Sequence, residues 1–82
     1  MANESDKLVT LVLVYGPRGR HEGGRHEVRV TRGQAAEIKV LRDATTKAYH
    51  AYTLTDAEGG LYVVDVGSGS GLVELFIEED TQ

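Results

Sequence analysis

The sequence contains no cysteine and no tryptophan, and it has one proline, four tyrosines and one phenylalanine in 82 residues. Without cysteine, neither a disulfide framework nor a thiolate metal site can hold the chain together. Stability must therefore come from the 40% of residues that are hydrophobic. A chain of this length supports one core and no more, because such cores supply only about 3–5 kcal/mol at this size. We predict a single β domain over residues 1–82, with flexible tails at 1–6 and 78–82.

The net charge and the hydropathy of the chain argue against nucleic acids and membranes as partners. Thirteen acidic residues outnumber nine basic ones, which gives a net charge of −4. Nucleic-acid binding is disfavoured, because neutralising phosphates requires a concentrated basic face. The longest apolar run, Leu11–Tyr15, is far shorter than the ~20 residues of a bilayer span, and the acidic start is unlike a signal peptide. We expect a soluble cytoplasmic protein with no membrane partner.

The stretch Leu61–Ile77 shows the strongest pattern in the chain. Apolar residues alternate with others in two segments, as they do on half-buried strands. Between the segments, a glycine-serine run supplies residues that tolerate the positive φ angles of tight turns. The pattern predicts a β-hairpin whose buried rows are Tyr62, Val64 and Val66 on one strand and Val73, Leu75 and Ile77 on the other.

Four further strands are predicted upstream. Leu8–Tyr15 is apolar on both faces, which is typical of a strand that is buried on two sides or covered by a partner. His26–Thr31 and Tyr49–Leu54 alternate in the ordinary way. Ala36–Leu41 is compatible with helix or strand, and its alternation favours a strand because the run is short for a stable helix.

Turn signals separate these segments. They include Arg32-Gly33-Gln34, with Gly33 as the expected special conformer, and Arg42–Lys47, which is a loop or a single helical turn. Six short strands with glycine-rich connections predict an all-β fold, a small antiparallel sandwich or barrel. The expected inward side chains are Val12, Val14, Val28, Val30, Ile38, Val40, Ala51, Tyr62, Val64, Val66, Val73, Leu75 and Ile77.

No motif predicts catalysis, a cofactor or a metal. His21-Glu22 and His26-Glu27 carry metal-ligating groups, but their histidine spacing of five and the intervening Gly23-Gly24 do not match a zincin helix. A Walker loop needs lysine and Ser/Thr after its last glycine, whereas Leu72 and Val73 follow Gly71. The serines near Gly69 lack a nucleophile elbow. We therefore expect no enzyme.

A set of residues between Arg32 and Gly71 has the order and spacing of a known recognition module: Arg32, Glu37-Ile38, Val40-Leu41, Asp43, Thr45, His50-Ala51, Tyr62 and Asp65–Gly71. In these residues the chain resembles a forkhead-associated domain, a β-sandwich that reads phosphothreonine peptides. The resemblance implies that Arg32 contacts the phosphopeptide and that His50 is structural. The chain departs from the family at three positions: Lys47 replaces the phosphate-contacting serine, Ser70 replaces the peptide-gripping asparagine, and Thr31 replaces a glycine.

A second likeness competes with the first. Val28–Leu41 followed by Ala57–Val64 resembles early and late strands of immunoglobulin-like domains, with Tyr62 at the tyrosine-corner position and Val64 where the cysteine stands. Too few residues lie between the two segments for that family's middle strands.

The function predicted from these features is non-enzymatic protein binding on a forkhead-associated-like scaffold that has lost its phosphothreonine pocket. Candidate surfaces are the loops Gly16–Arg25, Arg42–Lys47 and Gly67–Gly71, or an exposed sheet edge that forms a homodimer. The alternative is a small viral or mobile-element protein, which acts as a structural accessory or inhibits a host enzyme by surface binding. The candidate binding residues are Arg32, Lys47, Ser68 and Ser70.

Overall fold

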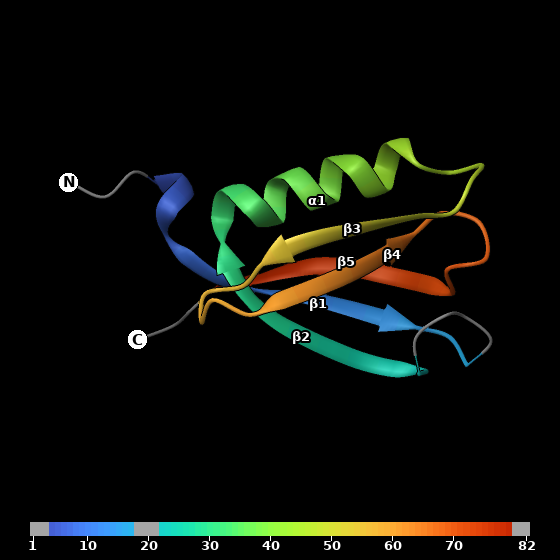
Figure 1. The fold of residues 1–82 in the computed structure, drawn as a ribbon, viewed down its shortest axis with the longest axis horizontal. Helices are drawn as coiled ribbons and strands as arrows, with labels where there is room; N and C mark the ends of the chain where they lie inside the picture. The colour runs from blue at the N-terminus through green and yellow to red at the C-terminus, as the bar shows by residue number, and fades with distance from the viewer. Residues whose placement is uncertain (1–3, 18–21, 80–82) are drawn as a thin grey trace.

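The computed structural model describes residues 4–17 and 22–79, which form five strands, one α-helix and one short 3-10 helix (Figure 1). The strands are antiparallel and lie in two sheets, ordered β2-β1-β5 and β3-β4. The prediction of an all-β sandwich or barrel is confirmed in part: the fold is mostly β with antiparallel strands in two sheets, but it contains an α-helix, one of the six predicted strands is absent and no closed barrel forms. In chain order the elements are η1 (Glu4–Asp6), β1 (Leu8–Tyr15), β2 (Gly24–Thr31), α1 (Arg32–Ala44), β3 (His50–Thr55), β4 (Leu61–Val66) and β5 (Leu72–Glu79).

Strand β1 is the centre of the larger sheet and has the bounds that its sequence predicts. It pairs with β2 along one edge and with β5 along the other, so the chain itself covers both edges. The row containing Leu11 and Leu13 faces the main core, and the opposite row contains Val12. Val12 is nevertheless fully buried. Its cross-strand neighbours are Glu27 and Phe76, and such neighbours on one face shield each other from water.

Helix α1 replaces the strand that we predicted at Ala36–Leu41, and that prediction is wrong. Thr31 begins the helix with a capping box, in which the Gln34 amide donates to Thr31 Oγ1 (3.1 Å) and the Thr31 amide donates to Gln34 Oε1 (2.9 Å). Ala35 and Ile38 are buried, three residues apart as on one helical face. The segment Arg32-Gly33-Gln34 is thus the first helical turn, and Gly33 has no positive φ angle.

The predicted hairpin between β4 and β5 does not form. Strand β4 pairs with β3, and β5 pairs with β1, so the Gly67–Gly71 segment crosses from one sheet to the other. The alternation within β4 itself is confirmed, because Val64 and Val66 are fully buried and Tyr62 packs against the same core. A local apolar pattern therefore identified the strand without identifying its partner.

A β-bulge in β5 changes which residues of that strand face the core, so part of the predicted inward row is wrong. Tyr15 pairs with Leu72 and Val14 pairs with Glu74, so Val73 is the extra residue between two successive pairs. Val73 is 66% exposed as a result, while Leu75 stays buried. Two other residues predicted to point inward are also exposed: Val40, on the outer face of α1, and Ala51, on the outer face of β3.

The second layer consists of α1 and the β3-β4 hairpin, which contribute to one core together with the inner face of the larger sheet (Figure 1). Gln34 Nε2 donates to the carbonyl of Thr55 (2.8 Å) and links the helix to the hairpin. Within the segments predicted as tails, Glu4–Asp6 form the 3-10 helix η1, and Glu78 and Glu79 belong to β5. Residues 1–3 and 80–82 lie outside the described residues. No helix among those described is long and apolar enough to cross a bilayer.

The hydroxyl group of Tyr15 joins the two sheets. It donates to the carbonyl of Asp65 (3.0 Å) and accepts from the amide of Asp65 (3.1 Å), so one buried side chain of β1 binds both backbone groups of a residue in β4. Burial raises the pKa of Tyr15 well above its ordinary value. Tyr62, in the same core, has a buried hydroxyl with no hydrogen-bond partner among the described residues.

Replacing Tyr15 with phenylalanine should lower the free energy of unfolding by about 1–3 kcal/mol, because both hydrogen bonds to the Asp65 backbone are lost. The matched control is Tyr62→Phe, which removes a hydroxyl that makes no such bond and should change the free energy by less than about 0.5 kcal/mol. Urea unfolding of both variants measures the difference. Equal losses in the two variants would contradict the role given to Tyr15.

The stability of the protein should also fall at alkaline pH. The unfolded Tyr15 hydroxyl ionises near its ordinary pKa of about 10, whereas burial raises the pKa in the folded chain. This contribution is fully present below about pH 10 and is lost as the pH rises above it. Urea unfolding between about pH 8 and pH 11 should show this decline, and Tyr15→Phe should make it shallower. An unchanged slope in the variant would exclude Tyr15 as its source.

Candidate functional site

Three of the predicted loops meet at one end of the molecule, which we call the loop end and define by residues 16–17, 22–23, 45–49 and 67–71 (Figure 1). The Gly16 amide donates to the carbonyl of Gly71 (2.7 Å), which ties the first loop to the third. Residues Arg18–His21 of the first loop lie outside the described residues. The turn between β3 and β4 is at the opposite end of the molecule.

Gly67 locks the second and third loops against each other. Its φ angle is +86°, and a Cβ atom at this position would overlap the carbonyl oxygen of Ala48. The backbone can approach this closely only because glycine has no side chain. Within the same turn, Ser70 Oγ donates to the carbonyl of Gly67 (2.7 Å) and accepts from the amide of Leu72 (3.2 Å). The prediction that this segment contains positive-φ glycines is confirmed.

Two tyrosines, the buried Tyr15 and the half-buried Tyr49, hold the same end of the molecule through Asp65. Tyr49, next to β3, donates its hydroxyl to Asp65 Oδ1, and the Asp65 backbone is bound by Tyr15. Asp65 is only 6% exposed. The loops therefore project from a fixed base.

The four predicted binding residues occupy different places. Lys47 and Ser68 are exposed at the loop end. Ser70 is buried, and both of its hydroxyl bonds serve the turn. Arg32 lies at the N-terminal end of α1, where its guanidinium binds Glu79 and approaches Glu4 at 3.3 Å.

The structure does not bring Arg32 and Lys47 together. Helix α1 is 13 residues long, and at about 1.5 Å per residue it separates Arg32 from the loop end by roughly 20 Å. The Arg32 guanidinium donates to Glu79 and holds the pKa of that carboxyl below its usual range. Arg32 is therefore engaged in a link between α1 and β5.

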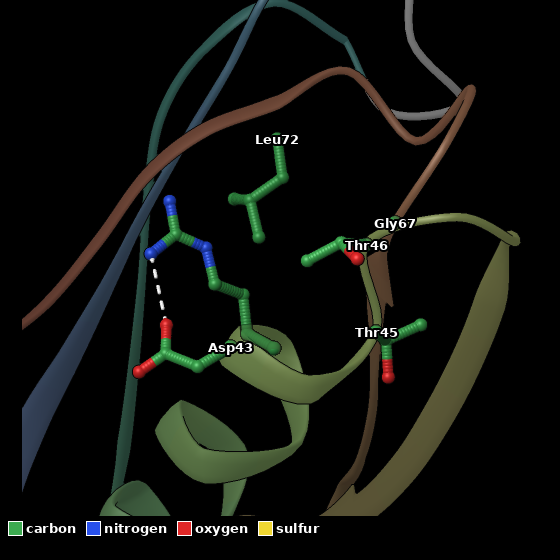
Figure 2. A pocket seen from close by; sticks show the side chains of 6 residues that line it. Asp43, Thr45, Thr46, Gly67 and Leu72 are labelled. Carbon is green, nitrogen blue, oxygen red and sulfur yellow. Dashed lines mark hydrogen bonds and ion pairs between the residues drawn. The ribbon is translucent and has the colours of Figure 1, made fainter.

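A shallow cavity of about 330 Å³ opens at the loop end beside the C-terminus of α1. Figure 2 shows Asp43, Thr46 and Leu72 around it, with Gly67 at one side. Thr45 ends the helix, since its amide donates to the carbonyls of Leu41 (3.0 Å) and Arg42 (3.2 Å). A neighbouring hollow of about 420 Å³ includes Lys47. The residues that line the first cavity are Arg42, Asp43, Thr45, Thr46, Gly67 and Leu72.

Arg42 and Thr46 were not singled out from the sequence. The sequence predicts Arg42–Lys47 as a loop or a single helical turn and as one of the candidate binding loops, but its first three residues belong to α1. A signal for this helix was present, because Thr31 and Gln34 have the spacing of a capping box. That spacing predicts a helix, but it says nothing about which loop the helix end will face.

Within the described residues, no further metal-ligating side chains join the His-Glu pairs of the first loop. His26 Nε2 lies 2.9 Å from the carbonyl oxygen of Glu22, and its ring makes an edge contact with Tyr15. Among residues 4–17 and 22–79, no three side chains of His, Asp or Glu gather as metal ligands would. His21 lies outside the described residues.

Comparison with protein-family models, curated proteins and solved structures finds no match for this chain. The forkhead-associated and immunoglobulin-like resemblances thus remain predictions from the sequence. Both resemblances use residues 37–41, which are helical in the structure.

Substituting Gly67 tests how firmly the loop end is held. Gly67→Ala should lower the free energy of unfolding by about 2–4 kcal/mol, because left-handed strain of about 1–2 kcal/mol adds to the overlap with Ala48. Gly69→Ala is the control, since Gly69 has a similar φ angle of +81° but no atom near the added Cβ. It should lose about 1–2 kcal/mol. Equal losses in urea unfolding would show that the two loops are not locked together.

Proposed function

We propose that this chain is a non-enzymatic protein-binding module that contacts its partner through the loop end. One observation carries the proposal: three loops far apart in the sequence are assembled at one end, where two hollows open beside the C-terminus of α1 (Figures 1 and 2). The second and third loops contribute to the lining of the first hollow, and the second loop lines the other. Loops held on a rigid β scaffold are the segments that most often carry recognition.

The described parts of the loop end are organised before any partner arrives. The Gly16–Gly71 hydrogen bond and the close approach of Gly67 to Ala48 fix the main chain. Tyr15 and Tyr49 hold Asp65 beneath it. A preformed surface binds at a lower entropic cost than one that must be ordered on binding.

A more specific interpretation, that the chain is a forkhead-associated-like scaffold, rests on the sequence resemblance alone. In this reading Lys47 and Ser68 contribute to the loop end, while Arg32 belongs to a different region of the surface. We therefore do not propose that the chain has the phosphothreonine pocket of that family.

Self-association through a sheet edge remains a prediction. It rests on the two apolar faces of β1, for which a second copy is one source of cover. Because β2 and β5 pair with both edges of β1, that strand has no edge left for a second copy. A dimer through a sheet edge would use the outer edge of β2, β5, β3 or β4.

Site-specific photo-crosslinking tests the proposed function. A benzophenone amino acid placed at Ser68 in the full chain should crosslink to one partner in extracts of the source cells, and unlabelled wild-type chain should compete. The control position is Glu58, which is exposed in the turn at the opposite end. The absence of any competed adduct at Ser68, or an equal yield of the same adduct at Glu58, would contradict a partner surface at the loop end.

A further inference from the structure

The larger sheet has an outer face, which points away from the core. The row of β1 that contains Leu11 and Leu13 faces the core, so the alternate row and its cross-strand neighbours face outward. The second layer, α1 and the β3-β4 hairpin, packs on the inner side (Figure 1). No α-helix or strand of the described residues is therefore left to cover the outer face.

Three rows of residues cross the outer face at successive levels along β1. In the order β2, β1, β5, the rows are Arg25, Val14 and Glu74; Glu27, Val12 and Phe76; and Arg29, Thr10 and Glu78. The β2 edge thus has two arginines and one glutamate, and the β5 edge has two glutamates and one phenylalanine. Because each arginine is level with a glutamate on the opposite edge, the face has a positive side and a negative side.

This pattern is complementary to itself when two copies pack face to face in one particular way. A two-fold axis parallel to β1 places β2 of each copy over β5 of the other and keeps every residue at its own level. Arg25 of one copy then faces Glu74 of the other, and Arg29 faces Glu78 in the same way. Packed sheets lie about 10 Å apart, a distance that an arginine and a glutamate bridge together.

The second face-to-face arrangement, with the two-fold axis perpendicular to the strands, is disfavoured by the same charges. It places β2 over β2 and β5 over β5, so arginine meets arginine and glutamate meets glutamate. Like charges that face each other across an interface oppose association. The charge pattern therefore selects the axis parallel to β1.

The centre of the outer face has the composition of an interface core. Val12 is fully buried, and Phe76 is half-buried beside it. The Arg25 guanidinium lies over the Phe76 ring, with its central carbon 5.6 Å from the ring centre. Aromatic residues and arginine are enriched in protein interfaces. The middle of this face can therefore be buried without leaving an isolated charge.

Arg25 and Glu74 have the capacity for an additional ion pair. Arg25 binds Glu27 through Nε (2.7 Å) and Glu78 through Nη2 (2.8 Å), and a guanidinium has five N–H donors in all. Glu74 is exposed and forms no ion pair with the described residues. A second copy can thus add a contact between Arg25 and Glu74 without breaking the pairs within each chain.

The size of the outer face sets the strength of such a contact. Strands β1, β2 and β5 have eight residues each. Their spacing and rise give a flat area of roughly 14 by 26 Å, or about 700–800 Å² for two copies. This is below the area of about 1,200–2,000 Å² in standard stable interfaces, so the association should be weak, with a Kd on the order of 0.1 mM.

We propose that this chain associates with a second copy of itself through the outer face of the larger sheet, about a two-fold axis parallel to β1. Arg25 and Arg29 of each copy face Glu74 and Glu78 of the other. This surface is separate from the loop end, so the dimer goes beyond the proposed function. The axis keeps the direction of β1, so both loop ends lie at the same end of the dimer; only the resulting bivalent binding rests on the proposed function.

Sedimentation equilibrium of the full chain between about 10 µM and 1 mM tests the association, a range that brackets the expected Kd. We expect a monomer–dimer equilibrium. Amide NMR shifts should change on dilution at Val12, Val14 and Phe76 and stay constant along α1. A monomer at every concentration, or shifts confined to another surface, would overturn the inference.

A charge reversal on β5 tests the predicted contacts. Glu74→Arg places like charges opposite Arg25 at two equivalent positions of the dimer and should raise the Kd at least about tenfold. Glu37→Arg, on the exposed part of α1, is the matched control and should not weaken association. Both changes lower the net negative charge, so general repulsion alone would favour the dimer in both. An unaffected Glu74→Arg chain, or an equal loss in the control, contradicts the proposed interface.

Mixing two variants tests the direction of the axis. Arg25→Glu alone and Glu74→Arg alone each bring like charges together, whereas a mixed dimer has opposite charges at both positions. The mixture should associate at least about fivefold more tightly than either variant. Circular dichroism checks that Arg25→Glu folds; if it does not, Arg29→Glu mixed with Glu78→Arg applies the same test at the other end of β1. No gain on mixing would reject the axis parallel to β1.

The two proposals can fail separately. A competed crosslink from Ser68 in a chain that stays monomeric would keep the protein-binding function and reject the dimer. A dimer that is weakened by Glu74→Arg, without any crosslinked partner at Ser68, would keep the dimer and reject the loop end as a partner surface.

Discussion

The hydroxyl of Tyr15 is the interaction on which the arrangement of the two sheets depends. The three-stranded and two-stranded sheets share no ladder, so their relative position is set by core packing and by side-chain bonds. Tyr15 supplies two of these bonds to the backbone of one residue, Asp65, in a place where water is excluded. A hydroxyl in this position fixes both distance and direction, which apolar contacts alone do not.

The geometry of the loop end follows from that junction. Asp65 lies one residue before the end of β4, and the chain then crosses at Gly67–Gly71 to reach β5 on the other sheet. Holding Asp65 therefore holds the crossover, and the crossover contacts both neighbouring loops through Gly67 and Gly71. The surface that we propose for binding is thus a consequence of how the two sheets are joined.

Sequence patterns predicted individual strands well and their partners poorly. The bounds of β1 follow from its continuous apolar run and the buried row of β4 from apolar alternation, and both are local properties. In α1, Ile38 and Val40 alternate with charged residues by coincidence, and this concealed the three-residue spacing of Ala35 and Ile38. Which strand β4 pairs with is a long-range choice, and the glycine-serine segment is as suitable for a crossover as for a hairpin.

For the candidate site as well, local features could be predicted from the sequence and long-range ones could not. Lys47 and Ser68 could be assigned to loops from local signals, but the role of Arg42 depends on α1 being a helix that ends beside the crossover. Ion pairs on the larger sheet also escape a simple register rule. Arg25 pairs with Val14 and Glu78 pairs with Thr10, so the Arg25 guanidinium reaches Glu78 diagonally across β1. Which side chains lie together at the loop end is consequently decided by where α1, β4 and β5 begin and end, and this is information that no local sequence pattern contains.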